Sequence, residues 1–374
     1  MRQQTNKTKV LFVLPGTTIG GAEIKTFNLL SSLNSFNRVL ITQSPIRTFY
    51  SELELDIYTF EDFGCMHPNI FSPGNIFSYA RAIKKVFDLE KPNIILGIMH
   101  SGTLFVTVSQ NLFFLRALPI VTIEGNISAY FKNINRPPTL KERLLLKYSF
   151  KRAKGIIVPS EGVKKDLVNH YCASEKKIIT IYNGIDIENI KKASEEEITY
   201  KKDCPWIVTA CRLNFQKDFD TLLKAFRIVR DKIKAKLFII GDGELKDDIF
   251  KLSSELGLDK DIIMPGFQKN PFTYISKADV FVLSSFFEGF GNVIVEAMSL
   301  GIPVVSTDCP SGPGEIIRDK ENGFLVPVRD FHEMASRFFL IFNDNGLKKN
   351  ISREAQKRSQ DFSINSMEKD STII

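Results

Sequence analysis

Short apolar runs alternate with longer amphipathic segments along almost the whole chain, and this rhythm constrains the fold more than any other feature. Short continuous apolar runs are typical of strands that are buried on both faces, whereas the segments between them repeat their apolar residues with a helical period. Strands that alternate with helices build a parallel sheet covered by helices. The sequence therefore predicts an α/β fold made of doubly wound sheets.

The expected elements form two series. Strands are predicted at 10–14, 38–42, 94–98, 119–123 and 155–158 in the first series, and at 206–210, 237–240, 262–264, 280–283, 303–306 and 324–326 in the second. Helices are predicted at 21–33, 77–89, 103–115, 140–153 and 161–170, and then at 218–231, 244–256, 271–277, 292–300 and 330–342.

The two series indicate two domains. A chain of 374 residues exceeds the size at which a single core usually stops growing. Asn183-Gly-Ile-Asp186 and a polar, charged stretch separate the series. We therefore predict Rossmann-like domains over 1–185 and 186–374, which face each other across a ligand-binding cleft. The last ~20 residues are expected either to pack back on the N-terminal domain or to fray.

Composition narrows the class of protein. The net charge of +7 is a modest excess that fits anionic small molecules or anionic lipid. The five cysteines form no Cys-x-x-Cys pair and no zinc spacing, so we expect a reduced, cytoplasmic setting. The apolar run 10–14 is too short for a signal peptide, and the longest apolar region, 102–123, is too interrupted to span a membrane.

The stretch 284–301 carries the strongest functional pattern. After an expected strand, it passes through the turn Glu288-Gly-Phe-Gly-Asn292 into an expected helix that Gly301 should end. A strand that leads into a helix in this way leaves the helix N-terminus free to bind an anion. Glu288 and Glu296 lie near that point, and their carboxylates accept hydrogen bonds from sugar hydroxyls.

Two other loops suit a diphosphate. Arg212 and Lys217 follow the strand at 206–210, and a guanidinium fork with a mobile ammonium would neutralise a pyrophosphate. Taken alone, such a pair is more often two solvated cations. Gly20 and Gly21 precede the first expected helix, where the backbone can approach a phosphate closely. Their spacing is not the dinucleotide fingerprint, and a tight turn without a ligand is an equal alternative.

Two loops and a histidine are weaker candidates. We interpret 241–244 as a turn rather than a ligand contact. The loop 306–315 is rich in glycine and proline, and its amides could meet a sugar or a phosphate. His100 follows the strand at 94–98, where a ligand contact and a packing role have equal odds.

The segment 141–154 separates charge from apolar bulk if it is helical. Lys147, Lys151 and Lys154 fall on one side, and Leu144, Leu145 and Tyr148 fall on the other. Such a charge run is usually a solvated helix face. The functional alternative is contact with an anionic membrane surface.

In combination, these motifs resemble the family 4 retaining glycosyltransferases. Glu288 and Glu296 have the spacing of the family's Glu-x7-Glu motif, and Gly301-Ile-Pro-Val-Val follows them. Further matches occur in the family's order, at Gly20-Gly21, Pro159-Ser-Glu161, Asn183-Gly-Ile-Asp186, Cys211-Arg-Leu-x3-Lys217 and Asn322-Gly323. The resemblance covers nearly the whole chain and is most specific over 205–327.

The resemblance implies a GT-B fold, a nucleotide-diphosphate sugar donor and no metal. By this resemblance, Arg212 and Lys217 would hold the diphosphate with help from Gly20 and Gly21, and Glu288 would contact the donor sugar. The amides of Phe290, Gly291 and Asn292 would lie beside sugar and phosphate, and Glu296 would bind the ribose. Two cations and a helix N-terminus can stabilise the charge that develops on the leaving diphosphate, which fits a reaction without a metal.

One departure from the family pattern concerns the loop after the strand at 119–123. Many relatives carry a histidine there, but this sequence reads Ile123-Glu-Gly-Asn126. We expect Glu124 or Asn126 to contact the sugar or the acceptor instead, with His100 as a further candidate.

The segment 265–315 resembles enzymes that build bacterial surface polysaccharides on lipid carriers. This implies transfer of a hexose or an N-acetylhexosamine, most commonly from a UDP-sugar, to a lipid-linked saccharide at the inner face of the cytoplasmic membrane. The alternatives are a GT-B sugar-nucleotide epimerase or hydrolase, and a catalytically silent, membrane-associated assembly protein. We expect no nucleic-acid partner.

Overall fold

The computed structural model describes residues 7–16, 21–33, 35–65 and 73–371. By their internal contacts these residues form two compact units. The first unit contains residues 1–128 and 136–181, and the second contains residues 129–135 and 182–374. The division at 181 precedes the boundary predicted after residue 185, because Ile185 already hydrogen-bonds to Phe362 of the second unit.

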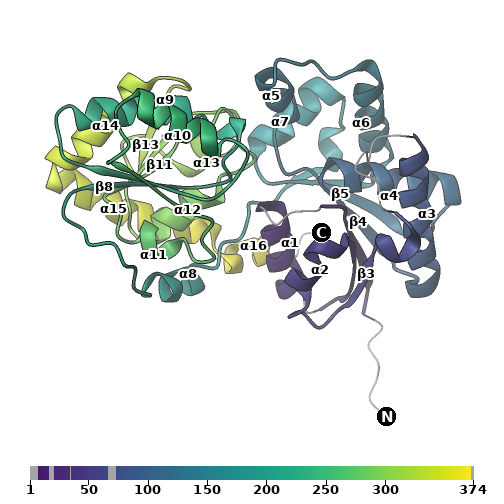
Figure 1. Ribbon diagram of the computed structural model, residues 1–374. Coiled ribbons are helices and arrows are strands. Elements are labelled where there is room, and N and C mark those ends of the chain that lie inside the picture. Colours follow the sequence, from purple (N-terminus) through teal and green to yellow (C-terminus); the bar gives the residue numbers. More distant parts are fainter. Residues whose placement is uncertain (1–6, 17–20, 34, 66–72, 372–374) are drawn as a thin grey trace, which may run out of the picture. The chain divides into compact units, whose positions relative to one another are not determined.

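The first unit is built on a parallel sheet in the order β3-β2-β1-β4-β5-β6-β7 (Figure 1). Its strands are β1 (Lys9–Leu14), β2 (Asn37–Thr42), β3 (Asp56–Thr59), β4 (Ile94–Ile98), β5 (Leu118–Thr122), β6 (Gly155–Val158) and β7 (Ile178–Thr180). Its helices are α1 (Gly21–Ser32), α2 (Ser44–Arg47), α3 (Pro73–Glu90), α4 (Met99–Phe113), α6 (Leu140–Arg152) and α7 (Glu161–Tyr171). The short helix α5 (Ile127–Asn133) begins in the first unit and ends among residues of the second.

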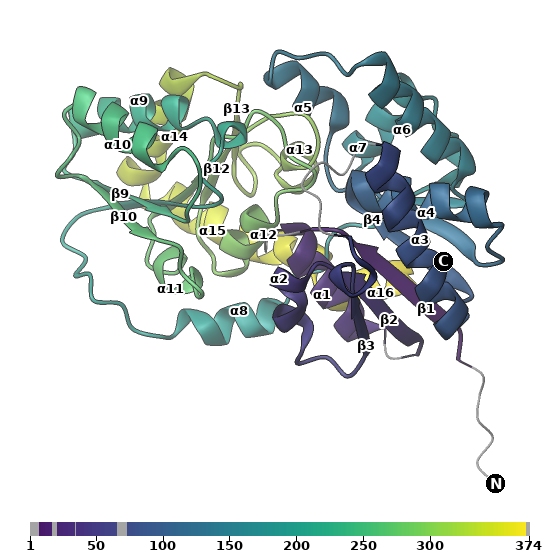
Figure 2. The same ribbon diagram turned by 45° about the vertical axis from the view of Figure 1, so that its right-hand side comes forward.

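Both faces of this sheet are covered by helices. Side chains of α1 and α2 pack on one face, whereas α3 and α4 pack on the other through a core that includes Tyr79 stacked on Phe105. Figure 2 shows α1 and α2 beside the strands β1, β2 and β3.

The second unit has a parallel sheet in the order β10-β9-β8-β11-β12-β13. Its strands are β8 (Trp206–Ala210), β9 (Lys236–Ile240), β10 (Ile262–Gly266), β11 (Val280–Leu283), β12 (Val304–Thr307) and β13 (Phe324–Val326). Its helices are α8 (Ile187–Ser194), α9 (Phe219–Arg230), α10 (Lys246–Glu255), α11 (Phe272–Ile275), α12 (Asn292–Ser299), α13 (Pro313–Ile316), α14 (Phe331–Asn343), α15 (Asn345–Ser359) and α16 (Ile364–Ser371).

This sheet is also doubly covered. In Figure 1, α9, α10 and α14 lie on one face, and α11, α12 and α15 lie on the other. Trp206, the single tryptophan of the chain, is fully buried in the second of these layers against Phe238. The predicted class, two doubly wound Rossmann-like domains of the GT-B type, is confirmed. The cleft between them stays a prediction, as does the packing of the last ~20 residues on the N-terminal domain.

Several elements have no counterpart among the predicted ones. The strand β3 is a half-buried edge strand, and its sequence Asp-Ile-Tyr-Thr lacks a clear apolar run. The helix α15 buries only Ile351, Ala355 and Ser359, so its helical period is weak in the sequence. Lys348 Nζ of α15 lies 2.6 Å from Asp279 Oδ1, and this partly buried ion pair attaches α15 to the residue before β11.

The basic segment 141–154 forms α6 as far as Arg152, so Lys154 lies beyond the helix on which it was predicted, and the apolar residues are also placed differently from the prediction. The helix buries Ser149 and Phe150, whereas Leu144 is exposed. None of the helices in the described parts of the chain is both long and apolar enough to cross a bilayer.

Candidate active site

The strand–loop–helix stretch predicted at 284–301 is present in the second unit. After β11 the loop leads into α12, whose N-cap residue Gly291 has φ 100°. A side chain would be strained in this left-handed conformation, so glycine permits the sharp entry into the helix. Gly301 ends the helix as predicted. Both the position of α12 and its free N-terminus follow from the local sequence.

The centre of the site is a buried ion pair between two loops. Lys217 Nζ lies 2.6 Å from Glu288 Oε1, and the two side chains are only 14% and 10% exposed. Ser285 Oγ donates to the same carboxylate oxygen over 2.6 Å. Gln216 Nε2 lies 3.3 Å from the other oxygen. Glu288 is therefore held in one orientation by three side chains.

Backbone contacts fix the loop that carries Lys217. Phe286 N donates to the Gln216 carbonyl oxygen over 2.8 Å, and Ser284 Oγ donates to the Lys217 carbonyl oxygen over 2.5 Å. Asp218, with φ 45°, then caps α9 by accepting a hydrogen bond from Thr221 N. The loops after β8 and β11 thus form one rigid unit around the ion pair.

The electrostatics of the pair favour the charged form of Lys217. Burial alone would lower the pKa of Lys217, but the neighbouring Glu288 carboxylate more than offsets this, and the pKa is raised. Two cysteines lie close by. Burial raises the pKa of Cys211 to about 11, and it also raises the pKa of Cys309, so both thiols stay neutral at physiological pH.

Arg212 is exposed in the same loop, one residue after Cys211. The loop is held by the turn at 241–244, since Leu213 N donates to the Asp242 carbonyl oxygen over 2.9 Å. A Cβ at Gly241 would lie 1.9 Å from the Cys211 carbonyl oxygen, so only glycine allows this approach. The turn therefore positions the arginine loop, which agrees with its interpretation as a structural turn.

The N-terminus of α12 offers donors to an anion. Among the described residues, none accepts a hydrogen bond from the amides of Phe290, Gly291 and Asn292. Such amides and the helix dipole favour negative charge. Asn183 Nδ2 donates to the Asn292 side-chain oxygen over 2.8 Å and so orients that side chain. The three amides follow Glu288 closely in the chain, at the end of its loop and the start of α12.

Glu296 is the fifth residue of α12. Within the described residues its carboxyl group has no hydrogen-bond or ion-pair partner, and burial raises its pKa to about 7. Although Glu296 is half-buried, a carboxyl without a donor in this environment is costly when ionised, and hydroxyl donors from a ligand would remove that cost.

The first unit holds the other predicted candidates. His100 is the second residue of α4 rather than part of a loop, because the helix begins earlier than predicted. Its Nε2 is buried and has no partner among the described residues. Burial lowers the pKa of His100, although the Asp166 and Glu124 carboxylates act in the opposite direction. Glu124 is half-buried and Asn126 is buried, and both precede α5.

The predicted glycine turn is only partly described. Gly21 is the first residue of α1, whereas Gly20 lies outside the described residues. Their predicted contact with the diphosphate stays a prediction.

Sequence reasoning missed the partners of the ion pair. Gln216 and Ser285 were not predicted as site residues, although each adjoins a predicted motif. Their positions next to predicted motifs could have identified them, since Gln216 precedes Lys217 and Ser285 lies in the 284–301 stretch.

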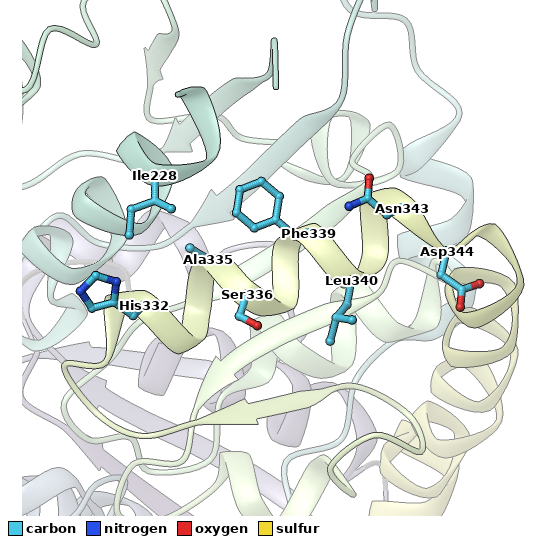
Figure 3. A pocket seen from close by; sticks show the side chains of 8 residues that line it. All are labelled: Ile228, His332, Ala335, Ser336, Phe339, Leu340, Asn343 and Asp344. Carbon is cyan, nitrogen blue, oxygen red and sulfur yellow. The ribbon is translucent and has the colours of Figure 1, made fainter. Parts of the chain in front are cut away.

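The structure also has a cavity of about 350 Å³ away from these residues. Figure 3 shows it between α9 and α14, lined by side chains that include Ile228, His332 and Phe339. None of the predicted site residues lines it. In the described residues no group of three His, Cys, Asp or Glu side chains could hold a metal ion. The predicted independence from metal stays a prediction.

The comparison with protein families matches both halves of the chain. Residues 19–189 match the model described as "Glycosyltransferase Family 4", and residues 190–358 match "Glycosyl transferases group 1". The chain belongs to the family 4 glycosyltransferases. The candidate site of this family 4 member lies in the half matched by the second model.

The similar proteins include glycosyltransferases of two bacteria, one of them named for capsular polysaccharide biosynthesis. An N-acetylgalactosamine-N,N'-diacetylbacillosaminyl-diphospho-undecaprenol 4-alpha-N-acetylgalactosaminyltransferase of Campylobacter jejuni is 34% identical over 60% of this chain and 60% of its own length. The capsular polysaccharide biosynthesis glycosyltransferase CapM of Staphylococcus aureus is 27% identical over 76% of this chain and 77% of its own. The match to the first three relatives spans between 44% and 60% of their own length.

A solved structure with the same fold is Anabaena Alr3699/HepE in complex with UDP and glucose. It superposes with a TM-score of 0.81 over 98% of both chains at 19% identity. At this identity the likeness shows the fold alone, which is the GT-B fold.

Proposed function

We propose that this family 4 member transfers a hexose or an N-acetylhexosamine from a UDP-sugar to a lipid-linked saccharide, with retention of configuration. The observation that carries the proposal is the Lys217–Glu288 pair beside the free N-terminus of α12. The HepE complex with UDP and glucose and the undecaprenol-linked acceptor named for the Campylobacter enzyme support this donor and this acceptor.

Each group has a chemical role in this proposal. Lys217, Arg212 and the amides of α12 take up the charge that develops on the leaving diphosphate, which is electrostatic stabilisation in a preorganised site. Glu288 accepts hydrogen bonds from hydroxyls of the transferred sugar, and Glu296 accepts them from the ribose.

The bond changes follow a front-face path. The acceptor oxygen bonds to the anomeric carbon on the face from which the diphosphate departs, while the bond between that carbon and the phosphate oxygen breaks. The acceptor proton passes to the departing phosphate. This path needs no protein nucleophile, and Glu288 is occupied by Lys217 and Ser285 rather than free to attack.

The acceptor places the enzyme at the inner face of a membrane. The exposed cations of α6, including Lys141, Lys151 and Arg152, are suited to anionic lipid. In this proposal the protein is a peripheral, cytoplasmic enzyme of bacterial surface polysaccharide synthesis.

Thermal melting with added nucleotides tests the donor class. UDP should raise the melting temperature and NAD should not, because no dinucleotide fingerprint is present. A panel of UDP-sugars with membrane lipid extract as acceptor then identifies the substrate. If NAD raised the melting temperature and UDP did not, the proposed function would be contradicted.

A further inference from the structure

The turn between α4 and β5 exposes three large apolar side chains. Leu112 is 44% exposed, Phe114 is 85% exposed and Leu118 is 53% exposed. The intervening Leu115 and Ala117 are buried. Phe114 and Leu118 therefore point to solvent, whereas Leu115 and Ala117 belong to the core of the first unit.

Folding does not explain a phenylalanine at position 114. The residue ends α4 with φ 49°, a left-handed conformation that favours glycine or asparagine. Its exposed ring gains little from burial in return. The turn is nevertheless firmly built, since Gln110 Nε2 donates to the Ala117 carbonyl oxygen over 2.7 Å and the Gln110 carbonyl accepts from Phe114 N and Leu115 N.

The segments on either side of the start of β5 carry exposed cations. Leu118 N donates to Asn93 O, and Lys154 N donates to Pro119 O, so β5 begins between the segments that carry Lys91 and Lys154. The exposed cations of these segments form no ion pair with any described residue: they are Lys91, Arg116, Arg152 and Lys154. Three carboxylates of the flanking segments form ion pairs: Asp88 with Lys84, Glu90 with Lys9, and Glu175 with Lys164, which also contacts Glu161.

The turn continues the basic surface of α6. The helices α4 and α6 pack side by side (Figures 1 and 2), and Thr107 Oγ1 of α4 donates to Ser149 Oγ of α6 over 3.1 Å. Each of the two helices ends where the next strand of the sheet begins. The cations at the C-terminus of α6 therefore belong to the same edge as Phe114.

We propose that this α4–β5 turn, residues 112–118, docks the chain on a lipid bilayer with anionic headgroups. Leu112, Phe114 and Leu118 enter the interfacial region, while Arg116 and the neighbouring lysines contact headgroup phosphates. Charge complementarity and the exposed apolar side chains select this partner. The inference deepens the membrane contact of the proposed function and rests on it for the choice of partner.

Co-sedimentation with vesicles tests the docking turn. The full chain should bind vesicles of phosphatidylcholine with phosphatidylglycerol, and bind phosphatidylcholine alone much more weakly. Phe114→Asn combined with Leu118→Thr should lower the bound fraction about tenfold. Asparagine tolerates the left-handed backbone and threonine suits a strand, so the fold should persist. The matched control is Phe250→Gln, which removes an exposed phenylalanine of α10 and should bind like wild type.

The salt dependence of vesicle binding distinguishes apolar insertion of this turn from a purely electrostatic contact. Binding that remains at high salt should depend on Phe114 and Leu118, whereas Arg116→Glu with Lys154→Glu should weaken binding mainly at low salt. Phe114→Trp should shift its emission to the blue on vesicle addition, against the constant signal of buried Trp206.

Three results would overturn the inference: no binding of wild type to anionic vesicles, equal binding of the Phe114→Asn, Leu118→Thr variant, or a change confined to self-association in sedimentation velocity. UDP-induced thermal shifts are measured on the same samples. Vesicle binding without a UDP response would refute the proposed function and leave the docking turn standing.

Discussion

Glu288 of the second unit and His100 of the first unit are held in opposite states. In the second unit, Glu288 is fixed by Lys217, Ser285 and Gln216 before any ligand is present. In the first unit, His100 Nε2 is buried without a partner among the described residues. The difference teaches that the proposed donor site is preorganised around Glu288, whereas His100, a proposed acceptor contact, would still have to be satisfied by a ligand.

Of the variants proposed here, Glu288→Gln should lower the rate of sugar transfer most. The amide keeps the size of the side chain but loses the negative charge that Lys217 faces, and we expect transfer to fall about 10²–10³-fold. UDP affinity should be nearly unchanged, because the diphosphate and ribose contacts remain. Steady-state transfer and calorimetric UDP titration measure both quantities. A collapse of UDP binding would show that the role assigned to Glu288 is wrong.

Lys217→Met tests how strongly the buried pair supports the fold. It leaves the Glu288 carboxylate buried without its cation, which should cost about 3–5 kcal/mol of unfolding free energy. Lys217→Met combined with Glu288→Leu should recover most of that loss, since no buried charge is left unpaired. Urea unfolding measures both variants. Equal stability of Lys217→Met and wild type would mean that the pair is effectively solvated.

Glu296 predicts a pH dependence in donor binding. Its pKa of about 7 in the unliganded protein must fall when hydroxyl donors reach the carboxylate, so UDP affinity should rise between pH 6 and pH 8 by up to about tenfold. Glu296→Gln should bind UDP more weakly at pH 8 and without this dependence. If wild type and Glu296→Gln showed the same dependence of UDP affinity on pH, the proposed contact between Glu296 and the ribose would be contradicted.

The same carboxyl affects the unliganded fold in the opposite direction. Because its folded pKa is raised from 4.5 to about 7, it contributes stability below pH 4.5 that is lost as the pH rises through 7. Relative to wild type, Glu296→Gln should therefore gain up to about 3 kcal/mol between those values. Urea unfolding at pH 5 and pH 8 measures the difference.

His100→Phe should have the smallest effect of these variants. It should alter acceptor binding, which we assign to the first unit, rather than donor binding. Removing the imidazole should raise the KM for the acceptor a few-fold, about what one neutral hydrogen bond is worth. UDP affinity should not change. An effect on UDP affinity with an unchanged acceptor KM would move His100 to the donor side.

Motifs made the donor residues predictable, but not their mutual arrangement. Glu288, Glu296, Arg212 and Lys217 each lie at a strand end or a helix start, where sequence patterns are informative. The pairing of Lys217 with Glu288 joins residues 71 positions apart, which no local period encodes. Gln216 and Ser285 were missed for the same reason, since their role depends on that pairing.

The first unit was less predictable because its helices begin and bury residues at positions other than those predicted. His100 was expected in a loop, but α4 begins at Met99, which has φ 64°. A left-handed methionine at a helix start has no sequence signal, so the helix was placed too late. Likewise α6 buries Ser149 and Phe150 and leaves Leu144 in solvent, because packing against α4 rather than apolar content selects the buried face.

Calorimetric titration with UDP and with uridine tests the central claim, that Lys217, Arg212 and the N-terminus of α12 bind a diphosphate. Wild type should bind UDP at least about 100-fold more tightly than uridine, because charge-assisted contacts to the diphosphate dominate. Lys217→Met should lose most of that difference, whereas Lys224→Met, which removes an exposed lysine of α9, should keep it. Equal affinity of wild type for UDP and uridine would contradict the account.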